Sequence, residues 1–178
     1  NPATQQTLYL QTGDPTDRYF TNIAWSPNEQ SLFLIELNRD QNHAKLCQYD
    51  ATTGTLQHVL YEESHPKYVE PSNPICFLPW DSNLFIYQSQ RDGFNHLWLM
   101  DLKKLQANSL EVAGKQLTSG DWLVKEVLGF NAKKKEIIFT ATKESPLQSN
   151  IYKVSVANGK VTRIDQAEGV HRAQLSTS

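Results

Sequence analysis

Hydrophobic residues in this chain alternate with polar or smaller residues, in short runs rich in aromatic and β-branched side chains. Ile23 and Trp25 follow this period of two, and so do Phe33, Ile35 and Leu37. Such alternation predicts strands with one buried face. One weak helical pattern, near residues 102–107, predicts no more than a single turn of helix. The predicted strands are residues 20–26, 31–38, 43–50, 55–62, 74–79, 83–90, 95–101, 114–118, 124–131, 136–142, 149–156 and 160–165.

The strands recur with a period of about 52 residues. Similar segments begin at residues 23, 75 and 128, and a strand-like run follows each of them at the same distance. A fixed period of this size indicates an array, and four antiparallel strands per period are typical of a β-propeller blade. We therefore predict an all-β fold, a fragment of a β-propeller with about three four-stranded antiparallel blades near residues 20–66, 71–120 and 121–166. An open, solenoid-like stack of the same sheets is the alternative.

The two ends of the chain do not fit whole blades. Residues 1–12, with a strand at 7–11, are predicted to supply the outer strand of a preceding blade. Residues 168–178, with a strand at 170–176, are predicted to open a following blade. A closed propeller needs more than three blades, so we expect a piece of a larger array, with further chain upstream because residue 1 is Asn rather than Met. Exposed blade edges would favour self-association by strand pairing.

Composition narrows the possible functions. The net charge is −2 and the basic residues are scattered along the sequence, which predicts no nucleic-acid partner. No apolar run is long enough to predict a membrane span. The two cysteines, Cys47 and Cys76, lie in apolar strand-like runs and are predicted to be free and buried. The five histidines lack metal-ligand spacing and no Gly-x-Ser-x-Gly motif occurs, so no metal site, cofactor or catalytic residue is predicted.

Two motifs resemble known propellers. Residues 25–33 begin with Trp-Ser-Pro, as do blades of the prolyl oligopeptidase and TolB groups. Residues 89–97 resemble the Ser-x-Arg-Asp-Gly-x-x-His-Leu hairpin of those blades, and residues 38–43 are similar to part of it. Because Asp-Gly supplies a tight turn with positive φ, we interpret the polar residues of this hairpin as stabilising the turn rather than binding a ligand. They are Arg91, Asp92, Asn95 and His96.

Longer stretches resemble the bacterial dipeptidyl peptidase IV family, in the right order along nearly the whole chain. They are residues 36–43, 65–71, 122–130, 140–147 and 169–176. The resemblance implies the second half of an eight-bladed propeller that precedes an α/β-hydrolase domain with a Ser-Asp-His triad. Members of the family remove N-terminal dipeptides with Pro or Ala in the second position, usually dimerise, and in bacteria lie in the periplasm or at the outer membrane. The C-terminal hydrolase domain and the peptide substrate are therefore the implied partners.

The family also holds the amino terminus of its substrate with two adjacent glutamates in an Asp-Trp-x-Tyr-Glu-Glu setting. Glu62 and Glu63 form such a pair but lack the Asp-Trp, whereas Asp121 and Trp122 lack the pair. We interpret both places as ordinary blade segments and expect the amine anchor upstream of residue 1.

Residues 65–71 are the strongest candidate for substrate contact, because the corresponding connection in the family approaches the peptide pocket beyond the second residue. By this resemblance Tyr68 would form an apolar wall and Glu70 a polar contact. Packing of this loop on its own blade is the alternative, since loops on rigid scaffolds carry function often but not always.

Aromatic residues occupy equivalent positions in the three repeats and are predicted to pack between blades. They are Trp25, Phe77 and Phe130, and Trp98 and Trp122 are predicted to be buried as well. Two functions stay open at this point. One is the non-catalytic propeller portion of a dipeptidyl peptidase IV-like serine exopeptidase that gates and lines the substrate cavity. The other is a TolB-like propeller that binds protein partners and belongs to no enzyme.

Overall fold

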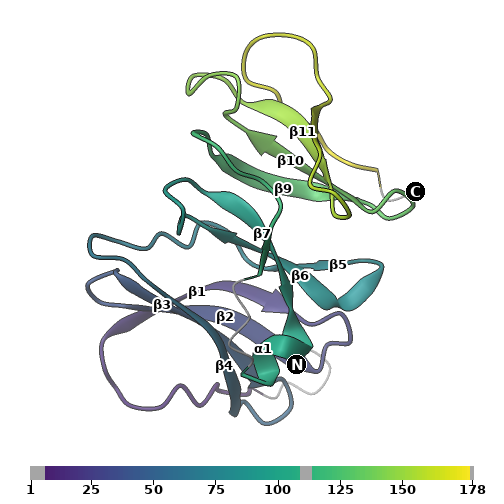
Figure 1. Ribbon diagram of the computed structural model, residues 1–178. Helices are drawn as coiled ribbons and strands as arrows, with labels where there is room; N and C mark the ends of the chain where they lie inside the picture. Colours follow the sequence, from purple (N-terminus) through teal and green to yellow (C-terminus); the bar gives the residue numbers. More distant parts are fainter. Residues whose placement is uncertain (1–6, 109–113, 177–178) are drawn as a thin grey trace. The chain divides into compact units, whose positions relative to one another are not determined.

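The computed structural model describes residues 7–108 and 114–176, and shows an almost entirely β protein. Its strands form three four-stranded antiparallel sheets, and within each sheet the strands lie side by side in chain order (Figure 1). Up-and-down connectivity of this kind is that of propeller blades, so the predicted fold class is confirmed. The described residues up to 75, together with 102–108, form one compact unit, and those of 76–101 and 114–176 form a second.

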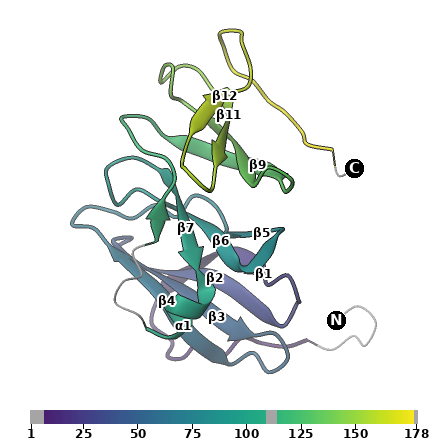
Figure 2. The ribbon, with the colours of Figure 1, turned by 45° about the vertical axis from the view of Figure 1, so that its right-hand side comes forward.

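The first unit holds the first sheet. Asn38 fixes one of its hairpins, because Asn38 Oδ1 accepts hydrogen bonds from the backbone N–H groups of Asn42 and His43, both at 2.9 Å. The helix α1 (Leu102–Gln106) contacts strand β4, as Figure 2 shows, and is the single turn that the sequence predicted. The strands are β1 (Arg18–Trp25), β2 (Ser31–Asn38), β3 (His43–Asp50) and β4 (Leu56–Ser64).

One face of the first sheet is only partly covered. The strand register places Trp25, Leu32, Tyr49 and Leu56 in one row across the four strands. Tyr49 is fully buried in a cluster to which Leu10 contributes, but Trp25 is 57% exposed. The prediction that Trp25 is buried is therefore wrong for this chain. The physical reason is that the apolar cluster on this face gathers around Tyr49 and Leu10 and, among the described residues, does not extend to Trp25.

The second unit holds the other two sheets and a shared apolar core. Trp122 lies in this core, with ring centroids 6.4 Å from Phe139 and 6.5 Å from Tyr152. Phe130 packs edge-on against Trp80 of the neighbouring sheet, at 6.0 Å, as predicted for an aromatic between blades. The strands are β5 (Cys76–Leu78), β6 (Asp81–Ser89), β7 (His96–Asp101), β8 (Lys115–Gln116), β9 (Val124–Asn131), β10 (Glu136–Ala141), β11 (Asn150–Ser155) and β12 (Val161–Arg163).

Other aromatic and cysteine positions follow the sequence predictions less closely. Phe77 contacts Phe85 of its own sheet, with 5.6 Å between ring centroids. Trp98 is only partly buried. Both cysteines are free; Cys47 is buried and Cys76 is partly exposed.

The two partial strands predicted at the ends are not formed. Residues 7–11 are extended without strand pairing, and the Gln11 N–H donates to Gly54 O at 2.7 Å. Residues 170–176 make one isolated bridge, between Val170 and Ser149. A strand needs a neighbour to supply a ladder of hydrogen bonds. Within the described ranges, the backbone of residues 7–11 bonds to one distant residue, Gly54, and that of residues 169–171 to one, Ser149, so neither segment has such a ladder. The remaining parts of the predicted end segments, residues 1–6 and 177–178, lie outside the described residues, as do 109–113.

None of the helices in the described ranges is long and apolar enough to cross a bilayer.

Candidate functional site

The connection that leaves β4, residues 65–75, is fixed to its own sheet at three points. The His65 N–H donates to Asn42 O at 3.0 Å, and the Val69 N–H donates to Gln41 O at 2.8 Å. Asn22 Nδ2 donates to Pro71 O, also at 2.8 Å. The acceptors Asn42 and Gln41 lie in the β2–β3 hairpin. Asn22 lies in β1, where the strand register is irregular. The connection is therefore held along one end of the first sheet, not as a free linker.

His65 gives the start of this connection its shape. Its Nδ1 accepts hydrogen bonds from the backbone N–H groups of Lys67 at 3.1 Å and Tyr68 at 3.4 Å. This is the geometry by which Asn or Asp oxygens cap a turn, here made by an imidazole nitrogen. Nδ1 must be unprotonated to accept these bonds, so the ring proton of the neutral form lies on Nε2. The Tyr68 ring meets the His65 ring edge-on, at 6.4 Å between centroids.

The fixed backbone directs Tyr68 and Glu70 to solvent. Val69 is 7% exposed and points inward, whereas Tyr68 is 56% exposed and Glu70 is exposed. An exposed phenol ring offers an apolar wall with a polar edge, and a carboxylate accepts hydrogen bonds from N–H groups or an ammonium. The two predicted site residues are thus presented on the same short segment. The three bonds and the buried Val69 also agree with the alternative, a loop packed on its own blade, so substrate contact by Tyr68 and Glu70 stays a prediction.

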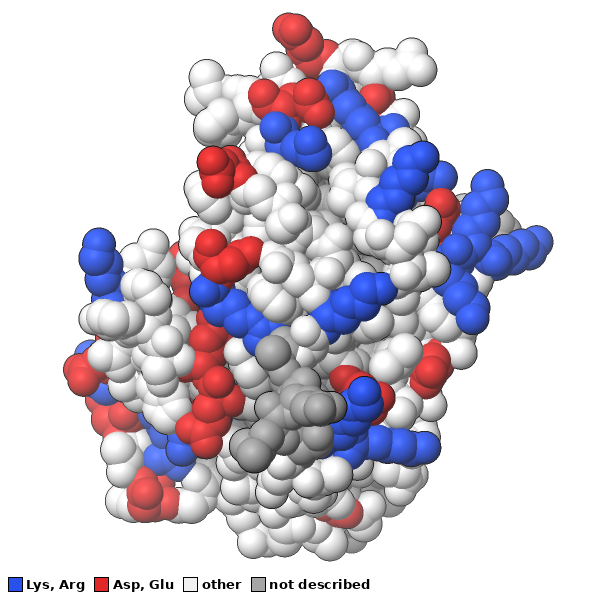
Figure 3. All heavy atoms as spheres, viewed as in Figure 1, with Lys and Arg blue, Asp and Glu red and all other residues white. Residues whose placement is uncertain are grey.

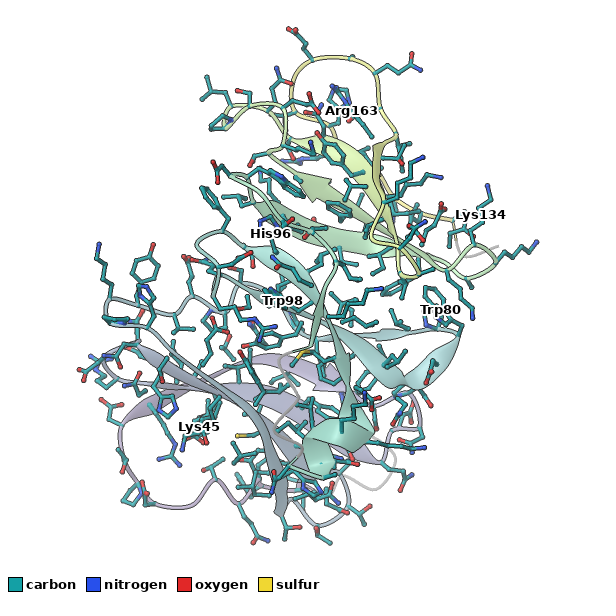
Figure 4. All side chains as sticks on the ribbon, in the orientation of Figure 1. Lys45, Trp80, His96, Trp98, Lys134 and Arg163 are labelled. Atoms are coloured by element: carbon teal, nitrogen blue, oxygen red, sulfur yellow. The ribbon has the colours of Figure 1, made fainter. Side chains whose placement is uncertain are left out.

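A second fixed connection enters the third sheet, and the polar hairpin residues predicted from the sequence hold it. Asn95 Nδ2 donates to Val124 O at 2.7 Å and to Gln88 Oε1 at 2.9 Å. His96 is completely buried, and its Nε2 donates to Gly120 O at 3.0 Å while Nδ1 lies 3.1 Å from the Thr118 hydroxyl. Figure 4 shows His96 inside the second unit. These residues stabilise structure, as predicted, but they bind a segment more than twenty residues away as well as their own turn.

Arg91 and Asp92 complete this hairpin. The Arg91 guanidinium stacks on the Trp98 ring, with 3.4 Å between its central carbon and the ring centroid. Asp92 accepts a hydrogen bond from Gln116 Nε2 on strand β8. Both contacts lie within the second sheet and its hairpin, so the structure supports the interpretation of these residues as structural.

The other sequence candidates have local partners. Glu62 lies 2.7 Å from His43 Nε2 on the neighbouring strand, and Trp122 is enclosed by the aromatic core. Within the ranges that the structure describes, no three His, Cys, Asp or Glu side chains are placed to hold a metal ion.

Sequence reasoning missed two polar groups. Arg18 Nε lies 3.0 Å from Glu36, beside a cavity of about 510 Å³ in the first unit whose lining includes charged residues of both signs as well as Leu56 and Val59. In the second unit Asp165 accepts from Arg163 Nε at 2.6 Å and from the Ile151 N–H at 2.8 Å. Burial disfavours the charged form of Asp165, but these bonds outweigh it and keep the pKa of the carboxyl below its usual value. Arg18 and Glu36, and likewise Ile151 and Asp165, are far apart in sequence, so no local motif predicts these contacts.

The comparisons with known proteins agree on one family. The family model for the dipeptidyl peptidase IV N-terminal region matches residues 1–178. The crystal structure of a candidate dipeptidyl aminopeptidase IV from Bacteroides ovatus is 59% identical, with a TM-score of 0.82, over 90% of this chain and 24% of that one. The Porphyromonas gingivalis dipeptidyl peptidase 4 structure is 24% identical, with a TM-score of 0.70, over 89% and 21% of the two chains, and supports the fold.

Curated relatives are more distant. The mouse "Inactive dipeptidyl peptidase 10" is 27% identical over 142 residues, which cover 77% of this chain and 17% of that protein. The "Probable dipeptidyl-aminopeptidase B" of Arthroderma gypseum is 27% identical over 154 residues, or 80% and 16% of the two sequences. The chain thus spans about a sixth of the length of these relatives. By its match along the whole sequence, it belongs to the family of dipeptidyl peptidase IV N-terminal regions.

Proposed function

We propose that this chain is the non-catalytic propeller portion of a dipeptidyl peptidase IV-like serine exopeptidase. The whole protein would remove N-terminal dipeptides with Pro or Ala in the second position. Its chemistry, acyl transfer through a serine ester, would belong to an α/β-hydrolase domain beyond this chain. The part described here would line the substrate cavity and limit which peptides enter it.

The observation that carries this proposal is the fixed connection of residues 65–71. Three hydrogen bonds to the sheet and the His65 cap hold its backbone, so the backbone loses little additional freedom when a ligand binds. Tyr68 would pack against the peptide beyond its second residue. Glu70 would accept a hydrogen bond from a peptide N–H or from a basic side chain at that position.

Family membership favours this function over a TolB-like binding scaffold. It does not establish activity, since one curated relative is named as inactive. We further propose a location in the periplasm or at the outer membrane. We also propose that the isolated chain associates with itself through exposed blade edges, such as the edge strand β1 of the first sheet.

The test compares substrates of different length in the full-length protein. Tyr68→Ala should lower kcat/KM for peptides of five or more residues by about tenfold, the loss expected for one aromatic contact. It should leave hydrolysis of a Gly-Pro chromogenic substrate unchanged, because that substrate ends before the connection. Tyr9→Ala removes another exposed tyrosine, which lies outside the connection, and is the matched control. An unchanged kcat/KM at every peptide length would remove Tyr68 from the site.

Glu70→Gln keeps the shape of the side chain and removes its charge. We expect weaker cleavage of peptides with Lys or Arg in the third position and no change for peptides with Ala there. An equal effect on both peptides would contradict a direct contact with Glu70.

A further inference from the structure

Five lysines gather at one end of the second unit, although the basic residues are scattered along the sequence. Three of them, Lys133, Lys134 and Lys135, are consecutive and exposed in the β9–β10 hairpin. Lys160 is exposed in the β11–β12 hairpin, and Lys115 lies beside it on β8. We call these five residues the lysine patch. Figure 4 labels Lys134 at its tip, and Figure 3 shows basic side chains gathered on this side of the second unit.

Hydrogen bonds hold the parts of the lysine patch together. The Val156 N–H donates to Lys135 O at 3.1 Å, which joins the two hairpins. Lys115 Nζ donates to Val156 O at 2.9 Å and to Ala157 O at 3.0 Å, which places its charge against the β11–β12 hairpin. These bonds fix the backbone of the two hairpins relative to each other, so the lysine side chains are held in one region of the second unit.

The patch has little negative charge to balance it. Residues 131–136 and 155–161 contain one carboxylate, Glu136, and its Oε1 is paired with Lys153 Nζ at 2.9 Å. The whole chain nevertheless has a net charge of −2, so the lysine patch is positive although the chain as a whole is slightly negative. A surface of this kind attracts polyanions.

A partly buried tryptophan borders the patch. Trp80 contacts Phe130, the residue that precedes the β9–β10 turn by one strand position, with 6.0 Å between ring centroids. Lys134, labelled with Trp80 in Figure 4, lies in the turn that follows Phe130. An indole with one apolar side and one polar edge, next to flexible lysines, is the combination that suits the boundary between lipid head groups and acyl chains.

We propose that the lysine patch docks on an anionic lipid surface, with Trp80 at the boundary of the contact. Two features favour lipid over nucleic acid. The two turn segments, residues 131–136 and 155–161, contain no arginine for bidentate phosphate or base contacts and no aromatic residue for base stacking. Lysines at the tips of hairpins can also meet a flat lipid surface, whereas a nucleic-acid strand would follow a basic groove. This inference is independent of the peptidase proposal.

Each lysine near an anionic membrane surface should raise the partition coefficient about fivefold. Neutralising the three lysines of the β9–β10 hairpin should therefore weaken binding by roughly 100-fold. Binding should also fall steeply with ionic strength, because exposed charges are screened beyond a Debye length.

The experiment is vesicle co-sedimentation of the full-length protein, with phosphatidylglycerol/phosphatidylcholine vesicles and with phosphatidylcholine alone. Lys→Gln substitution at 133–135 is compared with Lys→Gln at Lys103, Lys104 and Lys143, which removes the same charge from exposed lysines outside the patch. We expect the patch variant to lose binding to anionic vesicles and the control variant to keep it. Circular dichroism checks that both variants are folded.

Three results would overturn the proposal. The first is binding by the patch variant within twofold of the unmodified protein. The second is equal binding to vesicles with and without anionic lipid. The third is binding to duplex or single-stranded DNA through the patch with no binding to vesicles.

Discussion

Asn95 links two sheets of the second unit, because its side-chain amide nitrogen donates hydrogen bonds to an acceptor oxygen in each. Its Nδ2 lies 2.7 Å from Val124 O and 2.9 Å from Gln88 Oε1, and the side chain is buried. Asn95→Ala removes both donors. Asn95→Asp keeps the shape of the side chain but points a carboxylate oxygen at two acceptor oxygens.

The expected losses differ in size because of this geometry. Asn95→Ala leaves the buried Val124 carbonyl without this donor, and we expect a loss of about 2 kcal/mol in the free energy of unfolding. Asn95→Asp adds an uncompensated buried charge, and we expect a loss of about 4 kcal/mol or more. The introduced carboxyl should have a folded-state pKa above its unfolded value. Its destabilising effect should then grow as the pH rises above about 4 and should diminish at lower pH.

Urea denaturation of both variants at pH 7 and pH 5, followed by tryptophan fluorescence and circular dichroism, measures these differences. The Ala variant serves as the control for the loss of the bonds alone. Equal stability of the two variants at pH 7, or an Asp variant that becomes less stable relative to the Ala variant at pH 5, would refute the reasoning.

Three further predictions concern the core, the connection and a thiol. Trp122→Ala should lower the free energy of unfolding by about 3–5 kcal/mol, whereas Trp122→Phe should cost less in the same denaturation assay. His65→Ala should make residues 65–71 more susceptible to limited proteolysis, and His65→Asn, which keeps an acceptor at the cap, should not; equal cleavage would argue against the cap. Burial raises the pKa of the Cys47 thiol to about 11, so at pH 8 native Cys47 should react with iodoacetamide roughly 100-fold more slowly than an ordinary thiol. Rapid native labelling of Cys47 would contradict its burial.

Much of the fold could be predicted from local pattern. The strands at 31–38, 43–50 and 124–131 were predicted with the bounds that the structure shows, because alternation and turn residues determine them locally. The strands predicted at 7–11 and 170–176 are not formed, since strand formation depends on a neighbour as well as on the sequence of the strand itself; their assignment to a preceding and a following blade stays a prediction.

The same limit applies to individual residues. Aromatic type predicted the burial of Trp122, but aromatic type together with repeat position failed for Trp25, which lies outside the apolar cluster on its face of the sheet. Asn95 and His96 were interpreted as turn residues, yet their main partners lie at residues 118–124, and no local spacing records such a contact. The outward direction of Tyr68 and Glu70 could be suggested only by resemblance, because it depends on the anchors at Gln41 and Asn22.

Hydrolysis of a Gly-Pro chromogenic substrate, by the 178-residue chain and by the full-length protein side by side, tests the central claim most directly. We predict dipeptide release by the full-length protein and none above background by the chain alone. Activity of the isolated chain, or a folded full-length protein that does not cleave the substrate, would contradict the account.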